Sequence, residues 1–264
     1  MSITLTNASY SYPDGSLAVE SVTLEIRAGE RVAIVGQNGA GKTTTAKMLN
    51  GLLKPSTGTV EVDGIPTQSS TTATIAQIVG YVFQNPDDQL FGSSVRDELE
   101  FLPRRNKWDA ATMAERVTRA AELAGITEHL DSNPNDLPFA VRKFVAIGAI
   151  LVNQCRYVIL DEPTAGLDSQ GLILLNRLID VLEAEGVAVV TITHDMRFVA
   201  ESFSRVVVMA HRQIVADGRA AEVFSDDVVL RTARIKRPEV AQLSRDLNIS
   251  DRALTIEDVV GLLA

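Results

Sequence analysis

One eight-residue segment constrains the fold of this chain more than any other part of its sequence. Residues 36–43 read GQNGAGKT, which satisfies the pattern G-x-x-x-x-G-K-[ST], and they lie between an apolar run at 31–35 and a helical pattern at 42–52. A glycine-rich turn between a strand and a helix surrounds phosphate groups with backbone N–H groups and the positive end of the helix. The segment therefore predicts an α/β fold with a nucleotide-binding loop.

Individual residues of this loop have predicted contacts. The phosphate-binding set is Gly36, Asn38, Gly39, Ala40, Gly41, Lys42, Thr43 and Thr44. Within it, we expect Lys42 to reach the β and γ phosphates and the Thr43 hydroxyl to ligate Mg²⁺. We also expect Lys42 to be solvated without nucleotide, so that its removal costs phosphate contacts rather than core packing.

Short β-branched runs alternate with longer helical patterns, which is typical of an α/β domain with a largely parallel sheet. The runs are at 31–35, 157–160 and 187–193, and the helical patterns after them are at 42–52, 169–184 and 196–203. Two shorter alternating strands at 3–7 and 22–26, separated by a turn, predict an antiparallel β layer at the N-terminus.

A helical region interrupts the strand pattern. Residues 90–152 contain Ser94 as an N-cap, a helical run at 110–124 stopped by Gly125, and an apolar helix from Phe139. Caps and glycine stops of this kind mark the ends of helices. The region therefore predicts a helical subdomain, over about 90–152, inserted in the sheet domain.

The C-terminal part predicts a small helical extension. After a hairpin-like segment at 206–218, the chain offers two short helices between 238 and 264, the second opened by Thr255 with Asp258 three residues later. We divide the chain into a main domain over 1–218 and a C-terminal segment over 219–264.

The composition argues against several classes of function. With 34 acidic and 25 basic residues the formal net charge is -9, the wrong sign for coating a phosphate backbone, so we predict no nucleic-acid partner. The single cysteine, Cys155, allows no intramolecular disulfide and favours a reducing compartment. The longest apolar run, at 145–152, is far shorter than the roughly 20 residues of a spanning helix. A membrane role would require a partner in the membrane.

Two carboxylates follow the apolar strand predicted at 157–160. Asp161 and Glu162 would lie at the C-terminal end of that strand, where parallel sheets bind their ligands. Asp161 suits the shell of a Mg²⁺ ion, directly or through water. Glu162 is placed to polarise an attacking water as a general base.

Together these motifs resemble the ATP-binding-cassette (ABC) ATPases over nearly the whole chain. The phosphate loop, Gln84, the Asp161–Glu162 pair, residues 165–168 and His194 occur in that family's order and at similar spacings. The resemblance implies a P-loop ABC ATPase fold with a parallel core sheet. It also implies ATP and Mg²⁺ at the site, with ATP hydrolysis coupled to transport.

The same resemblance implies roles for residues outside the loop. Tyr12 would stack on adenine, and Gln84 would ligate Mg²⁺ and link it to the transmembrane partner. His194 would contact the γ-phosphate and, like Glu162, would be a catalytic residue. Asp168 would belong to the loop that communicates across an ATP-sandwich dimer.

Two segments resemble one group within the family, the energy-coupling-factor ATPases of cobalt, nickel, biotin and other vitamin importers. Residues 83–91 resemble their Q-loop, and 237–249 resemble their C-terminal dimerisation segment, a role we assign to 219–264. This implies a peripheral protein at the cytoplasmic face of the cell membrane. Its partners would be a second ABC ATPase subunit, a transmembrane energy-coupling protein and a membrane substrate-binding subunit. We expect residues 89–91 to dock helices of the transmembrane partner.

One motif departs from the family pattern. The signature loop reads LSGGQ in the family, with an arginine three residues later; here the positions hold Leu137, Pro138, Phe139, Ala140, Val141 and Phe144. That loop normally binds the γ-phosphate held by the other subunit through a serine hydroxyl and glycine N–H groups, and Pro138 offers neither. We therefore predict an asymmetric heterodimer with a paralogue, in which only the site opposite this loop is impaired.

Two other classes of function stay open. The weak signature loop also fits a regulatory nucleotide-binding subunit that does not hydrolyse ATP. A soluble ABC ATPase of DNA repair, chromosome organisation or translation is a third interpretation, which fits less well because the sequence has no coiled coil, zinc module or second cassette. The motifs do not name the transported substrate, since selectivity in such importers belongs to a membrane subunit.

Overall fold

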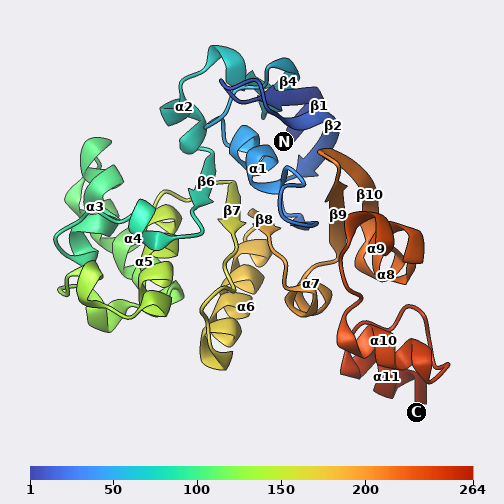
Figure 1. Ribbon diagram of the computed structural model, residues 1–264. Coiled ribbons are helices and arrows are strands. Elements are labelled where there is room, and N and C mark those ends of the chain that lie inside the picture. The colour runs from blue at the N-terminus through green and yellow to red at the C-terminus, as the bar shows by residue number, and fades with distance from the viewer. Residues whose placement is uncertain (264) are drawn as a thin grey trace.

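The computed structural model describes residues 1–263 and shows two β-sheets with helices packed on and between them (Figure 1). An antiparallel sheet of order β2-β1-β4-β5 is built from β1 (Ser2–Ser11), β2 (Leu17–Arg27), β4 (Thr57–Val62) and β5 (Ile65–Pro66). The predicted antiparallel layer is confirmed, but its first two strands are longer than expected. Shifts of register after Leu5 and Ala8 let the β1–β2 ladder continue past polar positions as far as the Ser11–Leu17 pair.

A largely parallel sheet forms the centre of the molecule, in the order β10-β9-β3-β8-β7-β6. Its strands are β3 (Arg31–Val35), β6 (Val79–Val82), β7 (Tyr157–Asp161), β8 (Ala188–Ile192), β9 (Arg205–Ala210) and β10 (Gln213–Arg219). β10 runs antiparallel to β9, and the other neighbouring pairs are parallel. Both β7 and β8 are buried at every position, which explains their uninterrupted apolar runs.

Each face of the parallel sheet has its own hydrophobic core. α1 (Lys42–Leu49) contacts β1, β4 and β8, and buries apolar side chains in the core between the two sheets. α6 (Ser169–Ala184) and α7 (Met196–Ser202) pack in the core on the other face. Alternate residues of β3 point into the two cores: Ile34 lies in the core between the sheets and Ala33 in the core on the other face.

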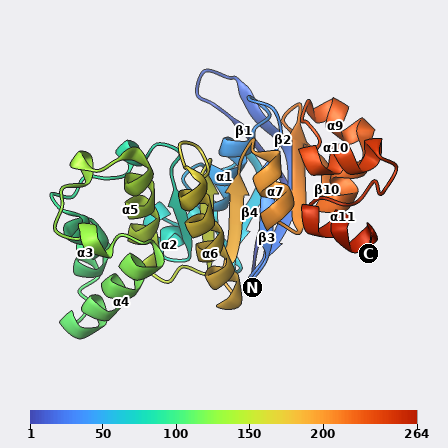
Figure 2. The same ribbon diagram turned by 90° about the horizontal axis from the view of Figure 1, so that it is seen from below.

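The helical region lies at one side of the sheets in both views (Figures 1 and 2). Its helices are α3 (Val95–Arg105), α4 (Ala110–Leu123) and α5 (Phe139–Leu151); the short α2 (Thr72–Ala76) precedes them. Single 3₁₀ turns are η1 (Thr67–Ser69), η2 (Pro86–Asp88), η3 (Thr127–His129) and η4 (Pro134–Asp136). Ser94 caps α3 as predicted, because its hydroxyl accepts the Asp97 N–H at 3.1 Å. At the start of α5, Pro138 provides no side-chain cap.

The C-terminal helices lie at the opposite side (Figure 2). They are α8 (Ala220–Ser225), α9 (Asp227–Ala233), α10 (Glu239–Asp246) and α11 (Ile256–Leu263). The predicted capping box opens α11: Thr255 Oγ1 accepts the Asp258 N–H at 3.2 Å, and Asp258 Oδ2 accepts the Thr255 N–H at 3.0 Å. Within residues 1–263, no helix is both long enough and apolar enough to cross a membrane.

Candidate active site

The phosphate loop connects the end of β3 to the start of α1, as its sequence predicts. Two glycines are required by their surroundings. A Cβ on Gly36 would lie 2.1 Å from the carbonyl oxygen of Met209, and one on Gly41 would lie 2.7 Å from that of Ala18. Both residues also have positive φ angles, 149° and 100°, which glycine adopts without strain. The loop therefore depends on close backbone packing against β9 and β2.

The Lys42 side chain is buried rather than solvated, which corrects our expectation. Its ammonium group donates to the carbonyl oxygens of Gly36 at 2.8 Å and Gln37 at 3.1 Å. The residue is only 7% exposed. Burial lowers the pKa of Lys42, although Glu162 and Asp161 favour its charged form. Two main-chain carbonyls of the loop therefore hold the Lys42 ammonium group.

Asp161, the last residue of β7, has one engaged and one free carboxylate oxygen. Its Oδ2 accepts a hydrogen bond from the Tyr81 hydroxyl at 2.8 Å. Its Oδ1 is buried with no hydrogen-bond partner in the described part of the chain. Burial raises the pKa of Asp161, and the neighbouring Glu162 adds to this effect. A buried carboxylate oxygen without a donor is suited to a cation or to water bound to one.

Glu162 and His194, which were predicted as catalytic residues with separate roles, lie side by side in the structure. The His194 Nδ1 atom lies 2.9 Å from Glu162 Oε2. The Glu162 side chain is 11% exposed and the histidine ring 72% exposed, so the carboxylate sits at the base of the site and the ring at its mouth. Glu162 has a φ of 49°, a rare conformation for this residue that turns the chain at the end of β7.

A cavity of about 740 Å³ joins these groups. Its lining includes Gly36, Asn38, Gly39, Gly41, Lys42, Thr43, Thr44, Gln84, Glu162 and His194, so the structure brings most of the predicted site together. It is also lined by Gln37, by Met196 of α7 and by residues 234–236, which sequence reasoning did not assign to the site.

Several predicted residues lie outside that lining. Ala40 is buried, and its N–H donates to the Gln37 carbonyl at 3.2 Å within the loop. Tyr12 is 40% exposed and its hydroxyl lies 3.1 Å from Thr44 Oγ1, at the edge of the loop. Asp168 caps α6 by accepting the Gly171 N–H at 2.8 Å. The phosphate contact of Ala40, the adenine stacking of Tyr12 and the dimer communication by Asp168 stay predictions.

The signature-loop residues 137–141 also lie outside the cavity, at the start of α5. Phe139 is 39% exposed, and its ring would lie 3.0 Å from a Cβ on Gly166. A loop that contacts the nucleotide of another subunit is expected to lie outside the nucleotide cavity of its own chain. The arrangement is thus compatible with the predicted contact across a dimer.

Lys143 is a site residue that the sequence analysis missed. Its ammonium group donates to the main-chain carbonyls of Glu162 at 2.7 Å and Pro163 at 3.3 Å. The residue is 4% exposed, and burial lowers the pKa of Lys143 to about 8. A lone lysine among buried positions of the apolar helix α5 was the available signal. Lys143 ties α5 to the turn that carries Glu162.

This lysine predicts a distinctive pH dependence of stability. Because the folded pKa of Lys143 is about 8 and its ordinary value is 10.5, the unfolded chain binds more protons between these values. The contribution of Lys143 to the free energy of unfolding should therefore rise with pH above about 8, by at most ~1.4 kcal/mol per pH unit. Urea unfolding from pH 7 to 10 should show a free energy of unfolding that rises more steeply with pH for the wild type than for Lys143→Met. Lys107→Met, at an exposed position, is the matched control, and equal slopes for all three proteins would contradict the prediction.

Comparison with known sequences identifies relatives along most of the chain. Residues 19–165 match the family described as ABC transporter. The chain is 37% identical over 262 residues to the energy-coupling factor transporter ATP-binding protein EcfA of Methanothermobacter thermautotrophicus, covering 97% of this chain and 84% of that protein. It is 39% identical over 246 residues to the protein of the same name from Methanoculleus marisnigri, covering 91% and 89%.

Solved structures show the same fold. The structure of cbiO1 from Clostridium perfringens, described as part of the ABC transporter complex cbiONQ, has a TM-score of 0.79 and 33% identity, covering 92% of this chain and 98% of that one. The ATP-binding cassette MJ0796, as a post-hydrolysis dimer bound to ADP and Pi, has a TM-score of 0.75 and 25% identity, covering 83% and 98%. The predicted fold class and family resemblance are confirmed. This chain belongs to the ABC transporter family as an ATP-hydrolysing cassette, and within that family it is similar to the energy-coupling factor ATP-binding proteins.

Proposed function

We propose that this chain binds and hydrolyses ATP as one subunit of an energy-coupling-factor importer for a vitamin or a transition metal ion. The observation that carries the proposal is the single cavity that joins the phosphate loop to Gln84, Glu162 and His194. The likeness to the EcfA proteins and to cbiO1 supports the importer class. In this proposal the chain is peripheral, at the cytoplasmic face of the membrane, beneath a transmembrane energy-coupling protein and a membrane substrate-binding subunit.

Different residues of this chain bind the nucleotide, accept the proton and stabilise the transferred phosphate. Lys42 and the N–H groups of the loop hold the β and γ phosphates, and Tyr12 stacks on adenine at the edge of the loop. Glu162 accepts a proton from the attacking water, and its pairing with His194 fixes the carboxylate in position. A proton on the other ring nitrogen of His194 donates to the γ-phosphate, where negative charge develops during transfer.

The residues present fit a Mg²⁺ ion. Asp161 Oδ1 is a buried oxygen to which no group within residues 1–263 donates, and Thr43 and Gln84 line the adjoining cavity with further oxygen ligands. Mg²⁺ prefers hard oxygen ligands of this kind. When bound, the ion would neutralise charge on the phosphates.

A dimer is part of the proposal because the signature loop of one subunit serves the nucleotide of the other. The C-terminal helices α10 and α11 and the residue after α10 leave apolar side chains exposed, including those of Leu243, Leu247, Ile256, Val260 and Leu262. Exposed apolar side chains in such number are typical of an interaction surface. They support a dimerisation role for 219–264. We propose a paralogous ATPase as the second subunit, because Pro138 and Phe139 cannot supply the usual phosphate contacts.

The proposed docking site for the transmembrane partner differs in detail from our expectation for 89–91. Gln89 points inward, where its side chain accepts from the Phe83 N–H at 3.1 Å and donates to the Ala146 carbonyl at 2.9 Å. Leu90 is half-buried against the core. Phe91 is 63% exposed and stacks edge-on against Phe101, with ring centroids 4.6 Å apart. Phe91 is therefore the better candidate for contact with a membrane subunit.

Phe91→Glu is expected to release the transmembrane partner without affecting ATP binding. The Phe91 main chain is held by the buried Glu98 carboxylate, which accepts its N–H at 2.9 Å, so the substitution should leave the fold intact. Tagged protein captured from detergent-solubilised membranes of its own cells would measure the associated hydrophobic subunits. Ile173→Glu, at a 60% exposed position of α6, is the control. Undiminished capture by Phe91→Glu would exclude this docking site, and capture of DNA or ribosomes instead would contradict the importer class.

A further inference from the structure

One wall of the nucleotide cavity comes from a segment without an assigned role. Arg234, Ile235 and Lys236 line it, although they lie in the link between α9 and α10, some forty residues after His194. Arg234 and Lys236 are exposed, while the Ile235 between them is half-buried and packs against the core. The link therefore meets the same cavity as the phosphate loop.

The charges of this wall suit a polyphosphate. Apart from His194, the ionisable side chains of the lining are Lys42, Arg234 and Lys236 against Glu162 alone. This excess of cations occurs in a chain whose formal net charge is -9. Guanidinium and ammonium groups are strong hydrogen-bond donors to phosphate.

The backbone at Arg234 is unusual for an arginine. Arg234 ends α9 in the left-handed conformation, with φ 52° and ψ 42°, and its N–H donates to the Arg231 carbonyl at 3.2 Å. Glycine is the usual residue at such a helix end, because a side chain is strained there. Because this strained residue also lines the nucleotide cavity, its side chain is a candidate for a role there.

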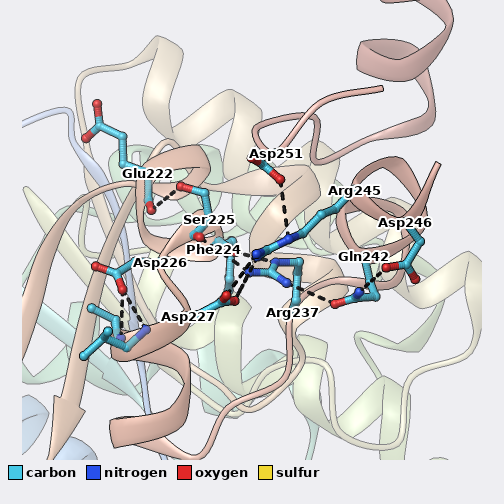
Figure 3. A network of polar contacts seen from close by, with 12 residues as sticks. Glu222, Phe224, Ser225, Asp226, Asp227, Arg237, Gln242, Arg245, Asp246 and Asp251 are labelled. Carbon is cyan, nitrogen blue, oxygen red and sulfur yellow. Dashed lines mark hydrogen bonds and ion pairs between the residues drawn. The ribbon is translucent and has the colours of Figure 1, made fainter. Parts of the chain in front are cut away.

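Ion pairs hold the far end of the link (Figure 3). The Arg237 side chain is 7% exposed and donates to the carbonyl of Phe224 at 2.8 Å and to Asp227 Oδ1 at 2.6 Å. Arg245 of α10 donates to both oxygens of Asp227 at 2.9 Å. Arg245 and Arg237 together lower the pKa of Asp227 to about 2, so these pairs stay charged at neutral pH. The link is anchored on both sides of Arg234 and Lys236.

We propose that Arg234 and Lys236 contact the terminal phosphate of ATP bound in their own chain, so that the C-terminal segment distinguishes ATP from ADP. The inference rests on the proposed function, in which Gln84, Glu162 and His194 mark the γ-phosphate end of the cavity. The link shares that cavity, whereas Tyr12 at the adenine side does not line it. Loss of the γ-phosphate on hydrolysis removes this contact.

Calorimetric titration of the full chain with ATPγS and with ADP, each with Mg²⁺, tests this contact. The double variant Arg234→Gln, Lys236→Gln should bind ATPγS roughly tenfold more weakly, since charge-assisted hydrogen bonds are lost, and ADP less than about threefold more weakly. Arg231→Gln removes an exposed arginine of α9 that does not line the cavity, and it should match the wild type. Lys42→Ala serves as the loop control and should weaken the binding of both nucleotides.

The variant Arg234→Gly distinguishes loss of the Arg234 side chain from damage to the fold. Glycine relieves the left-handed strain, so the melting temperature should stay equal or rise while the preference for ATPγS falls. Equal weakening of ATPγS and ADP by the double variant, or no weakening of either, would overturn the inference. If the wild type bound neither nucleotide, or if Lys42→Ala had no effect, the proposed site itself would fail.

Discussion

Glu162→Gln in the assembled dimer is expected to reduce ATP turnover by about 10²–10⁴-fold while ATP binding is retained. The carboxylate pairs with His194, with Oε2 at 2.9 Å from Nδ1, and the amide of glutamine cannot take up the proton of the attacking water. Glutamine has the same size, and Lys143 bonds the main-chain carbonyl of residue 162 rather than its side chain. The end of β7 should therefore keep its structure.

Phosphate release at saturating ATP measures turnover in this test, and titration with ATP measures binding. Glu201→Gln is the matched control, because it makes the same change on the surface of α7, where Glu201 pairs with Arg197. We expect the control to hydrolyse ATP at the wild-type rate. Normal turnover by Glu162→Gln with intact binding would reject Glu162 as the general base.

The chain on its own is expected to hydrolyse ATP about 10²–10³-fold more slowly than a pair with a paralogue that carries an intact LSGGQ loop. In a dimer of identical chains, both sites would face Pro138 and Phe139. Pro138 has no N–H. The Phe139 ring lies next to Gly166, and the cations of Arg142 and Lys143 are 5.9 and 5.5 Å from its centroid. The bulky ring occupies the place where a glycine would let the phosphate approach the backbone.

Two comparisons test this asymmetry. Substitution of residues 138–141 to SGGQ should raise the turnover of the isolated chain, whereas the same variant carrying Glu162→Gln should stay inactive. In the coexpressed pair, activity should disappear when Glu162 is replaced and persist when the paralogue's equivalent glutamate is replaced. Vigorous turnover by the isolated wild-type chain would show that the altered loop still functions. No turnover by any combination would instead favour a regulatory subunit.

Much of the fold was predictable because local signals determine it. The glycines of the phosphate loop, the cap at Ser94 and the capping box at Thr255 and Asp258 act within a few residues, and the structure contains each of them. Apolar runs without polar interruption predicted β7 and β8 as buried central strands. The apolar run at 157–160 also placed Glu162 at the C-terminal end of β7, where its carboxylate lies 2.9 Å from the His194 ring.

What sequence reasoning missed depends on contacts between distant segments. The burial of Lys42 follows from how the loop carbonyls fold back on it, and the inward turn of Gln89 from its bond to Ala146 on α5. Lys143 reaches a carbonyl nineteen residues further along the chain. The link at 234–236 meets the cavity only because the C-terminal helices fold back against α7 and β9. Contacts between segments so far apart in the sequence leave no local pattern from which they could be predicted.

The hydrogen bond from Lys143 to the Glu162 carbonyl connects the signature loop to the main chain of the general base. α5 starts at the signature loop, and Lys143 follows Phe139 by one helical turn, about 6 Å along the axis. A shift of the loop against the other subunit's nucleotide would therefore be passed directly to the main chain of this subunit's general base. We expect the impaired site, which binds ATP but hydrolyses it slowly, to influence hydrolysis at the other site. Movement of the signature loop against its ATP would shift Glu162 relative to the attacking water.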